Sequence, residues 1–211
     1  MTTTKLYQTN AYLKSCDSLI TSSQLLEKNE KPVSRTNYTK AAYVLTLDKT
    51  PFFPEGGGQS CDLGMINDWE VINVHKKGDE VYHTVLASAN QHTPPKAGDK
   101  VSCTINWDRR FDNMQRHCGE HILSGIFYSL YGGVNRGFHM GSDYMTIDIS
   151  LEEKPEFTEI THEMALTAEL EANKVIWSDA PVTVIRFKTR EEAEKMPLRK
   201  KLTFDDKLIC S

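Results

Sequence analysis

The sequence lacks three features that would each point to a well-known class of protein. It contains no run of 18 or more apolar residues, which excludes a membrane-spanning helix. Its first residues lack the apolar core of a secretory signal, so a cytoplasmic location is expected. It has no excess of positive charge, because 25 lysines and arginines stand against 29 acidic residues. The net charge of −4 is not that of a generally basic nucleic-acid-binding protein.

Paired cysteines are also missing. The five cysteines are odd in number, and no Cys-x-x-Cys motif occurs. This pattern argues against a disulfide framework and favours reduced thiols in a reducing compartment.

Because the net charge is negative, any contact with RNA must come from local basic patches in an otherwise ordinary globular composition. Two such patches are Arg109, Arg110 and Arg116, and Arg199, Lys200 and Lys201.

The first hundred residues have the pattern of short β-strands. Apolar and β-branched residues predict strands at 41–47, 65–74, 80–86 and 101–107, with a turn at 76–79. Several short strands separated by turn residues are typical of a small barrel or sandwich.

The pattern changes after Trp107. A helix is predicted up to about Tyr131, with Asp108 or Asp112 as its N-cap and Gly132-Gly133 as its end. The later elements predicted are a strand at 144–149, a helix at 155–177, a strand at 181–187 and a short helix at 191–196. Pro155 suits the first helical position. The sequence thus predicts an α+β protein with a β-barrel domain at 1–106 and an α+β domain at 107–211.

Two histidines in the first predicted helix are candidate metal ligands. His117 and His121 are four residues apart, which puts both imidazoles on one helix face with Cβ atoms about 5–6 Å apart. Zinc is the expected ion, because it prefers nitrogen and sulfur ligands. The same string also matches the His-x-x-Glu-His pattern of some metalloproteases. There Glu120 would be the general base, and Glu191 or Glu192 a downstream ligand. Without either role, Glu120 would be an exposed carboxylate.

A glycine-rich string, residues 50–60, is the most unusual local feature. Gly56, Gly57 and Gly58 permit positive φ angles and a close approach of the backbone to another surface or a substrate. The string is not a phosphate-binding Walker loop, because Gly-Lys-[Ser/Thr] is absent. The alternative is a tight turn in a β-domain, although a turn rarely needs three successive glycines.

Taken in order, these motifs resemble those of the alanyl-tRNA editing family. The family comprises the editing domain of alanyl-tRNA synthetase and the free-standing AlaX proteins. The resemblance spans nearly the whole chain, and the matching segments are residues 6–13, 50–59, 107–110, 114–125, 141–149 and 190–193. The family form of the glycine-rich string is T-x-F-Y-P-E-G-G-G-Q.

The resemblance implies a β-barrel followed by an α+β domain shared with threonyl-tRNA synthetase. It implies hydrolysis of the ester that joins serine or glycine to the acceptor end of tRNA(Ala), with Zn²⁺ as cofactor at His117 and His121. The substrate-binding residues implied are Thr50, Gly56, Gly57, Gly58 and Gln59. Thr50 would sense the serine hydroxyl, and the active site would lie in the cleft between the two parts. No Ser-His-Asp set is evident, so we predict attack by water. No DNA or membrane partner is expected.

The sequence departs from the family pattern at two places. The family completes its zinc site with a later Cys-x-x-x-His pair, which is missing here. Cys210 could replace one of these ligands, although its flanking residues do not match the family. We expect either a chain that ends before this pair or a natural variant with a weakened site. Second, His139 stands where the synthetases usually have glutamine. His139 could be a catalytic acid, a third ligand, a hydrogen-bond donor or an ordinary loop residue. The alternative function is a catalytically silent module that binds RNA or a synthetase.

Overall fold

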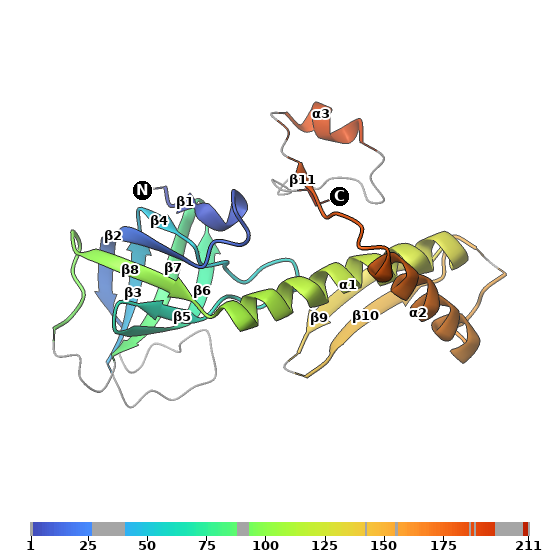
Figure 1. The fold of residues 1–211 in the computed structure, drawn as a ribbon, viewed down its shortest axis with the longest axis horizontal. Helices are drawn as coiled ribbons and strands as arrows, with labels where there is room; N and C mark the ends of the chain where they lie inside the picture. Colours follow the sequence, from blue (N-terminus) through green and yellow to red (C-terminus); the bar gives the residue numbers. More distant parts are fainter. Residues whose placement is uncertain are drawn as a thin grey trace. The chain divides into compact units, whose positions relative to one another are not determined.

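The structure of the protein is a computed structural model. This structure describes residues 2–26, 41–87, 93–141, 143–154, 156–185, 187, 189–196 and 209–210. The chain divides into two compact units, Met1–Glu159 and Ile160–Ser211, and each is described by itself. The α+β class is confirmed (Figure 1). The predicted boundary between residues 106 and 107 coincides with the change from strand to helix, and as a domain boundary it stays a prediction.

The first unit begins with a closed antiparallel β-barrel, as the sequence predicts. Its strands follow the spatial order β2-β3-β7-β6-β5-β8. They are β2 (Ser15–Leu25), β3 (Ala42–Leu47), β7 (Glu80–Ala87), β6 (Trp69–Lys77), β5 (Gly64–Ile66) and β8 (Lys100–Ile105). Alternate residues of each strand point inward, and these apolar side chains form the core. Closure of the sheet leaves no open edge.

Two details of the barrel differ from the prediction. The range 65–74, predicted as one strand, lies in β5 and β6, which are separated by a turn where Asn67 has φ 48°. β2 was not predicted, because its sequence SCDSLITSSQL is mostly polar. Only Ser18 and Ile20 of this strand are buried, so its hydrophobic alternation is too weak to see in the sequence. Beside the barrel, β1 (Thr4–Lys5) pairs in parallel with β4 (Lys49–Thr50), and the 3₁₀ helix η1 (Leu6–Gln8) follows β1.

A long helix, α1 (Trp107–Tyr131), follows the last barrel strand. The predicted N-caps Asp108 and Asp112 are wrong, because both lie inside the helix. The cap is Asn106, whose side-chain oxygen accepts a hydrogen bond from the backbone N–H of Arg109 at 3.1 Å. The predicted end is confirmed: Gly132 is the C-cap and adopts the left-handed conformation with φ 64°.

A buried ion pair fastens the start of α1 to the barrel. The Arg110 guanidinium contacts both carboxylate oxygens of Asp62, and it also donates to the carbonyl oxygens of Ala11 and Pro51. Both charged side chains are almost fully buried. Removal of one partner from such a pair would leave an uncompensated buried charge, so the pair strongly specifies how the helix leaves the barrel.

A two-stranded hairpin lies along α1 in the same unit (Figure 1). It consists of β9 (Val134–Met140) and β10 (Met145–Ser150), of which only β10 was predicted. Phe138 pairs with Ile147, and Met140 pairs with Met145. β9 was missed because Asn135, Arg136 and Gly137 interrupt its apolar pattern.

The second unit contains α2 (His162–Trp177), α3 (Arg190–Glu194) and the paired strands β11 (Val184–Ile185) and β12 (Ile209–Cys210). The predicted start of α2 at Pro155 is wrong: Thr161 is the N-cap, and Pro155 lies outside the described residues. Of the predicted strand at 181–187, the described residues include β11, and residue 186 lies outside them. Among the described residues, no helix is long and apolar enough to cross a membrane.

Candidate metal centre and glycine-rich turn

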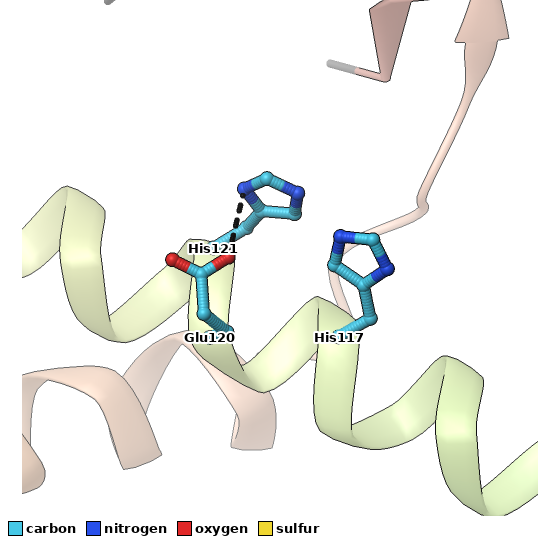
Figure 2. A group of neighbouring side chains, drawn as sticks. All are labelled: His117, Glu120 and His121. Carbon is cyan, nitrogen blue, oxygen red and sulfur yellow. Dashed lines mark ion pairs between the residues drawn. The ribbon is translucent and has the colours of Figure 1, made fainter. Parts of the chain in front are cut away.

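His117, Glu120 and His121 form a candidate metal-binding group on α1 (Figure 2). Their potential ligand atoms all lie within 4.8 Å of one another. The two imidazole rings are stacked, with centroids 4.9 Å apart. The helix produces this arrangement directly, because residues four positions apart lie on the same face. The predicted histidine pair is therefore brought together.

Gln59 fixes the proton on His117. The Nδ1 atom of His117 lies 2.8 Å from Oε1 of Gln59. An amide oxygen only accepts hydrogen bonds, so Nδ1 carries the proton and Nε2 keeps its lone pair. Burial is the main cause of a lowered pKa for His117, and the nearby His121 lowers it further. A neutral imidazole with a fixed Nε2 lone pair is the form that binds a metal.

Glu120 supports the second histidine. Its Oε2 atom lies 3.3 Å from Nδ1 of His121, as the dashed line in Figure 2 marks. Its Oε1 atom accepts hydrogen bonds from Ser124 and Asn135. The carboxylate is nearly buried, so its interpretation as an exposed helix carboxylate is wrong. A carboxylate bonded to Nδ1 leaves Nε2 of His121 for a metal, as in carboxylate–histidine–zinc sites.

The glycine-rich segment makes a tight turn beside His117. Gly56 and Gln59 exchange two backbone hydrogen bonds of 3.1 Å, and between them Gly57 and Gly58 have φ 60° and 79°. A Cβ atom on Gly58 would collide with the Phe138 ring and lie 3.1 Å from the Phe138 carbonyl oxygen. The turn is therefore both tight and in close contact with β9, and Gln59 at its end reaches His117.

Thr50, the last residue of β4, is fully buried. Its Oγ1 atom is 2.8 Å from Nε2 of His83 and accepts a hydrogen bond from the backbone N–H of Phe52 at 3.2 Å. The Nδ1 atom of His83 donates to the Leu45 carbonyl oxygen, so Nε2 is the acceptor and the Thr50 hydroxyl donates to it. This hydroxyl is thus engaged by His83 and Phe52, and its role towards a substrate stays a prediction.

His139 does not join the metal group. It is an exposed residue of β9, paired with Thr146, and not a loop residue. Its neighbour Phe138 contacts His117, with ring centroids 5.5 Å apart. Successive side chains of a strand point to opposite faces, so His139 points away from the face that Phe138 presents to His117.

The predicted basic patch at Arg109, Arg110 and Arg116 is not a single exposed surface. Arg110 is buried against Asp62. Arg109 donates through Nε to the Cys61 carbonyl oxygen, and Arg116 forms a 2.9 Å ion pair with Asp112. The second predicted basic patch, Arg199 to Lys201, lies outside the described residues.

The metalloprotease pattern predicted a downstream ligand at Glu191 or Glu192. Both glutamates are exposed residues of α3 in the second unit.

The residues that support the two histidines were not predicted from the sequence. Gln59 was expected to bind substrate, but its contact with His117 was not foreseen. Ser124 and Asn135 donate to Glu120, and Asn135 had no sequence signal of its own. A serine four residues after Glu120 on the same helix face was the one available hint.

Comparison with known proteins shows one matching family model and several similar proteins. The family model for class II tRNA synthetases (A) matches residues 2–109. The alanyl-tRNA editing protein AlaX-L of Pyrococcus horikoshii is 36% identical over 163 residues, which cover 75% of this chain and 38% of the relative. AlaX-M of Methanosarcina acetivorans is 32% identical over 167 residues, covering 75% and 64%. Aarsd1 of Bos taurus is 27% identical over 177 residues, covering 84% and 37%.

The chain spans less than two thirds of the length of each of these relatives. The matches nevertheless cover 75–84% of this chain. The chain belongs to the alanyl-tRNA editing protein family, which is related to the class II tRNA synthetases (A).

Proposed function

We propose that the protein hydrolyses the ester bond between tRNA(Ala) and a wrongly attached serine or glycine. The observation that carries this proposal is the pair His117 and His121, each with Nδ1 engaged and Nε2 left available, beside a glycine-rich turn. Family membership supplies the substrate class. The site itself supports a hydrolase, because metal-assisted attack by water needs no nucleophilic side chain.

Zinc is the metal we propose. The donor set of two imidazoles and one carboxylate suits Zn²⁺, which in catalytic sites takes three protein ligands and leaves one position open. His117 and His121 would hold the ion, with Glu120 as a third ligand or as the support of His121. When bound, the ion supplies a Lewis acid that polarises an ester carbonyl and a charge that orients the substrate.

The protein's own residues would prepare the site around that ion. Gln59 holds His117 in the correct tautomer, and Glu120 does the same for His121. Gly56 and Gly57 bear no side chains, so an ester or ribose can approach their backbone closely, whereas Gly58 packs against Phe138 and shapes the turn. Thr50 is the proposed determinant of serine over alanine. The catalytic role expected for His139 stays a prediction, because its side chain points away from the face of β9 that meets His117. Loss of more than about tenfold in activity in His139→Ala would support that role, and unchanged activity would remove it.

The decisive substrate test compares Ser-tRNA(Ala) with Ala-tRNA(Ala). We expect the full chain, supplied with zinc, to hydrolyse the seryl ester and to spare the alanyl ester. No excess hydrolysis of the seryl ester over the spontaneous rate would overturn the proposal. If the protein then still bound the RNA, a silent RNA-binding module would be the better account.

Thr50 can be tested with a matched pair of variants. Thr50→Ser keeps the hydroxyl, whereas Thr50→Val removes it and leaves Nε2 of His83 without its partner. We expect Thr50→Val to lose the preference for serine and also about 1–3 kcal/mol of stability, because a buried acceptor is left unsatisfied. An unchanged ratio of seryl to alanyl hydrolysis would exclude Thr50 from substrate discrimination.

A further inference from the structure

A small polar pocket lies next to the candidate metal centre. Its volume is about 230 Å³. It is lined by Ser60 after the glycine-rich turn, by Met140 and Gly141 at the end of β9, and by Arg109, Asp112, Asn113 and Arg116 on α1. Pockets for drug-sized ligands are usually larger, about 300–1,000 Å³. A space of this size suits one polar group and its nearest waters better than a whole nucleotide.

One hydrogen-bond donor that lines this pocket, the side-chain amide of Asn113, has no partner among the described residues. Asn113 is 5% exposed, and the atom without a partner is its Nδ2. Such buried orphan donors are rare in native proteins and call for an explanation. A ligand in the pocket that accepts a hydrogen bond from Asn113 would provide one.

The charges of the pocket favour an anion. Arg109 and Arg116 contribute two positive charges, against one negative charge from Asp112. The Nε atom of Arg109 donates to the Cys61 carbonyl oxygen, which holds the guanidinium in place. Arg116 is held by Asp112 and by a long, 3.5 Å contact to the Gly141 carbonyl oxygen. Two guanidinium groups, an amide and a hydroxyl are all donors, as an oxyanion with several acceptor oxygens requires.

The position of the pocket suggests which anion. Asn113 precedes His117 by four residues, so the pocket lies about one helical turn, or 5.4 Å, from the metal group. In an aminoacylated nucleotide, the ribose separates the ester from the nucleotide's own 5′ phosphate. An ester at His117 and His121 would therefore place this phosphate near Arg109 and Arg116.

We propose that the pocket formed by Arg109, Asn113 and Arg116 binds the phosphodiester on the 5′ side of the terminal nucleotide that carries the amino acid. This inference rests on the proposed function, because it takes the RNA acceptor end as the ligand. It adds a positioning site: the phosphate fixes the last nucleotide, and the ester is thereby held at the histidines.

The test is a binding cycle between the protein and one phosphate. The probe is an RNA hairpin with the acceptor-stem sequence and its single-stranded 3′ end. It is made with the natural linkage or with a neutral methylphosphonate at the last linkage, and fluorescence anisotropy measures its Kd for the full chain. We expect the neutral linkage to weaken binding about tenfold. The double variant Arg109→Ala/Arg116→Ala should lose the same factor with natural RNA, and both changes together should cost no more than either alone.

Two controls make the cycle specific. Arg136→Ala removes an equal charge from an exposed arginine of the same unit, and its loss should be the same with both RNAs. Asn113→Asp replaces the orphan donor by a carboxylate of the same shape. It should weaken binding of the natural RNA and leave the Kd of the neutral-linkage RNA unchanged.

The outcomes separate this site from the activity. The phosphate site would be overturned if the loss of affinity from the arginine variant and the loss from the neutral linkage multiply when the two are combined. This holds even if Ser-tRNA(Ala) is hydrolysed normally. Coupled losses without hydrolysis would support the phosphate site and overturn the proposed function. Failure of the unaltered protein to bind the RNA would overturn both.

Discussion

The contact between Gln59 and His117 is the most informative at the scale of single residues. It selects the tautomer of His117 whose Nε2 can bind a metal. Removal of such a supporting partner typically weakens metal binding 10–100-fold. We therefore expect Gln59→Ala to lower zinc affinity by about that factor, measured by competition with a chromogenic chelator.

The matched control is Gln115→Ala, which removes an exposed glutamine from the same helix as His117. Its zinc affinity should equal that of the unaltered protein. Equal affinities for all three proteins would mean that Gln59 does not prepare a metal ligand.

A buried histidine gives the fold a sensitivity to acid. Burial lowers the pKa of His83 from 6.5 to about 4 in the folded protein. Between these values the unfolded chain binds a proton that the folded chain does not, so the free energy of unfolding falls as the pH falls. Above pH 6.5 His83 contributes no pH dependence. The full loss by pH 4 is about 3 kcal/mol.

Denaturant unfolding at a series of pH values checks this expectation. His83→Gln should flatten the decline between pH 6.5 and 4, whereas His162→Gln, which changes an exposed histidine, should retain it. An equal decline in both variants would assign the acid sensitivity to other groups.

The residue scale also marks how far the sequence could predict the site. The spacing of His117 and His121 was sufficient, because a helix alone brings them together. The burial of Glu120 was not predictable, since it depends on Asn135 from a strand that the sequence did not reveal. Likewise, Gln59 meets His117 only because the turn and α1 are folded against each other.

At the scale of elements, the glycine-rich turn is the part most sensitive to sequence. Gly57 and Gly58 both have positive φ, but they differ in their surroundings. A Cβ on Gly57 would lie 3.8 Å from Cε1 of His117, an ordinary contact, whereas one on Gly58 would collide with Phe138. Gly57→Ala should therefore cost about 1–2 kcal/mol of stability from backbone strain alone.

Gly58→Ala should cost a further 1–3 kcal/mol, roughly, because the turn or β9 must shift. That shift should also move Gln59 and reduce hydrolysis of Ser-tRNA(Ala) more than Gly57→Ala does. Thermal unfolding and the rate of hydrolysis, measured on both variants, provide the comparison. Equal effects of the two variants on thermal unfolding and on the rate of hydrolysis would show that the contact of Gly58 with β9 does not matter for either property.

Strands with a strong apolar pattern were predictable, and β3 and β7 are examples. α1 was predicted from candidate caps at its start and from Gly132-Gly133 at its end, although four of its five buried residues are polar. β2 and β9 were missed because most of their residues are polar or glycine, and their pairing comes from neighbouring strands. The N-cap of α1 was misplaced because three polar residues, Asn106, Asp108 and Asp112, are all suitable caps, and tertiary contacts select among them.

At the scale of the whole molecule, the first unit joins two different parts around one site. The barrel contributes the turn with Gln59, and α1 contributes the histidines. The buried pair of Arg110 and Asp62 holds the helix on the barrel. The α+β class and the barrel could be predicted from the sequence, whereas the buried ion pair between Arg110 and Asp62 could not. Arg110 resembles a surface charge when only its neighbours in the sequence are known.

One measurement tests the central claim most directly: the rate of Ser-tRNA(Ala) hydrolysis by the full chain, followed together with its zinc content. Zinc content is set by chelation and graded return of the metal. We predict that the rate rises in proportion to bound zinc up to one ion per chain, and that His117→Ala neither binds that ion nor hydrolyses the ester. Cys118→Ser, on the same helix outside the candidate group, should behave like the unaltered protein. Hydrolysis that persists without zinc, or in His117→Ala, would contradict the account.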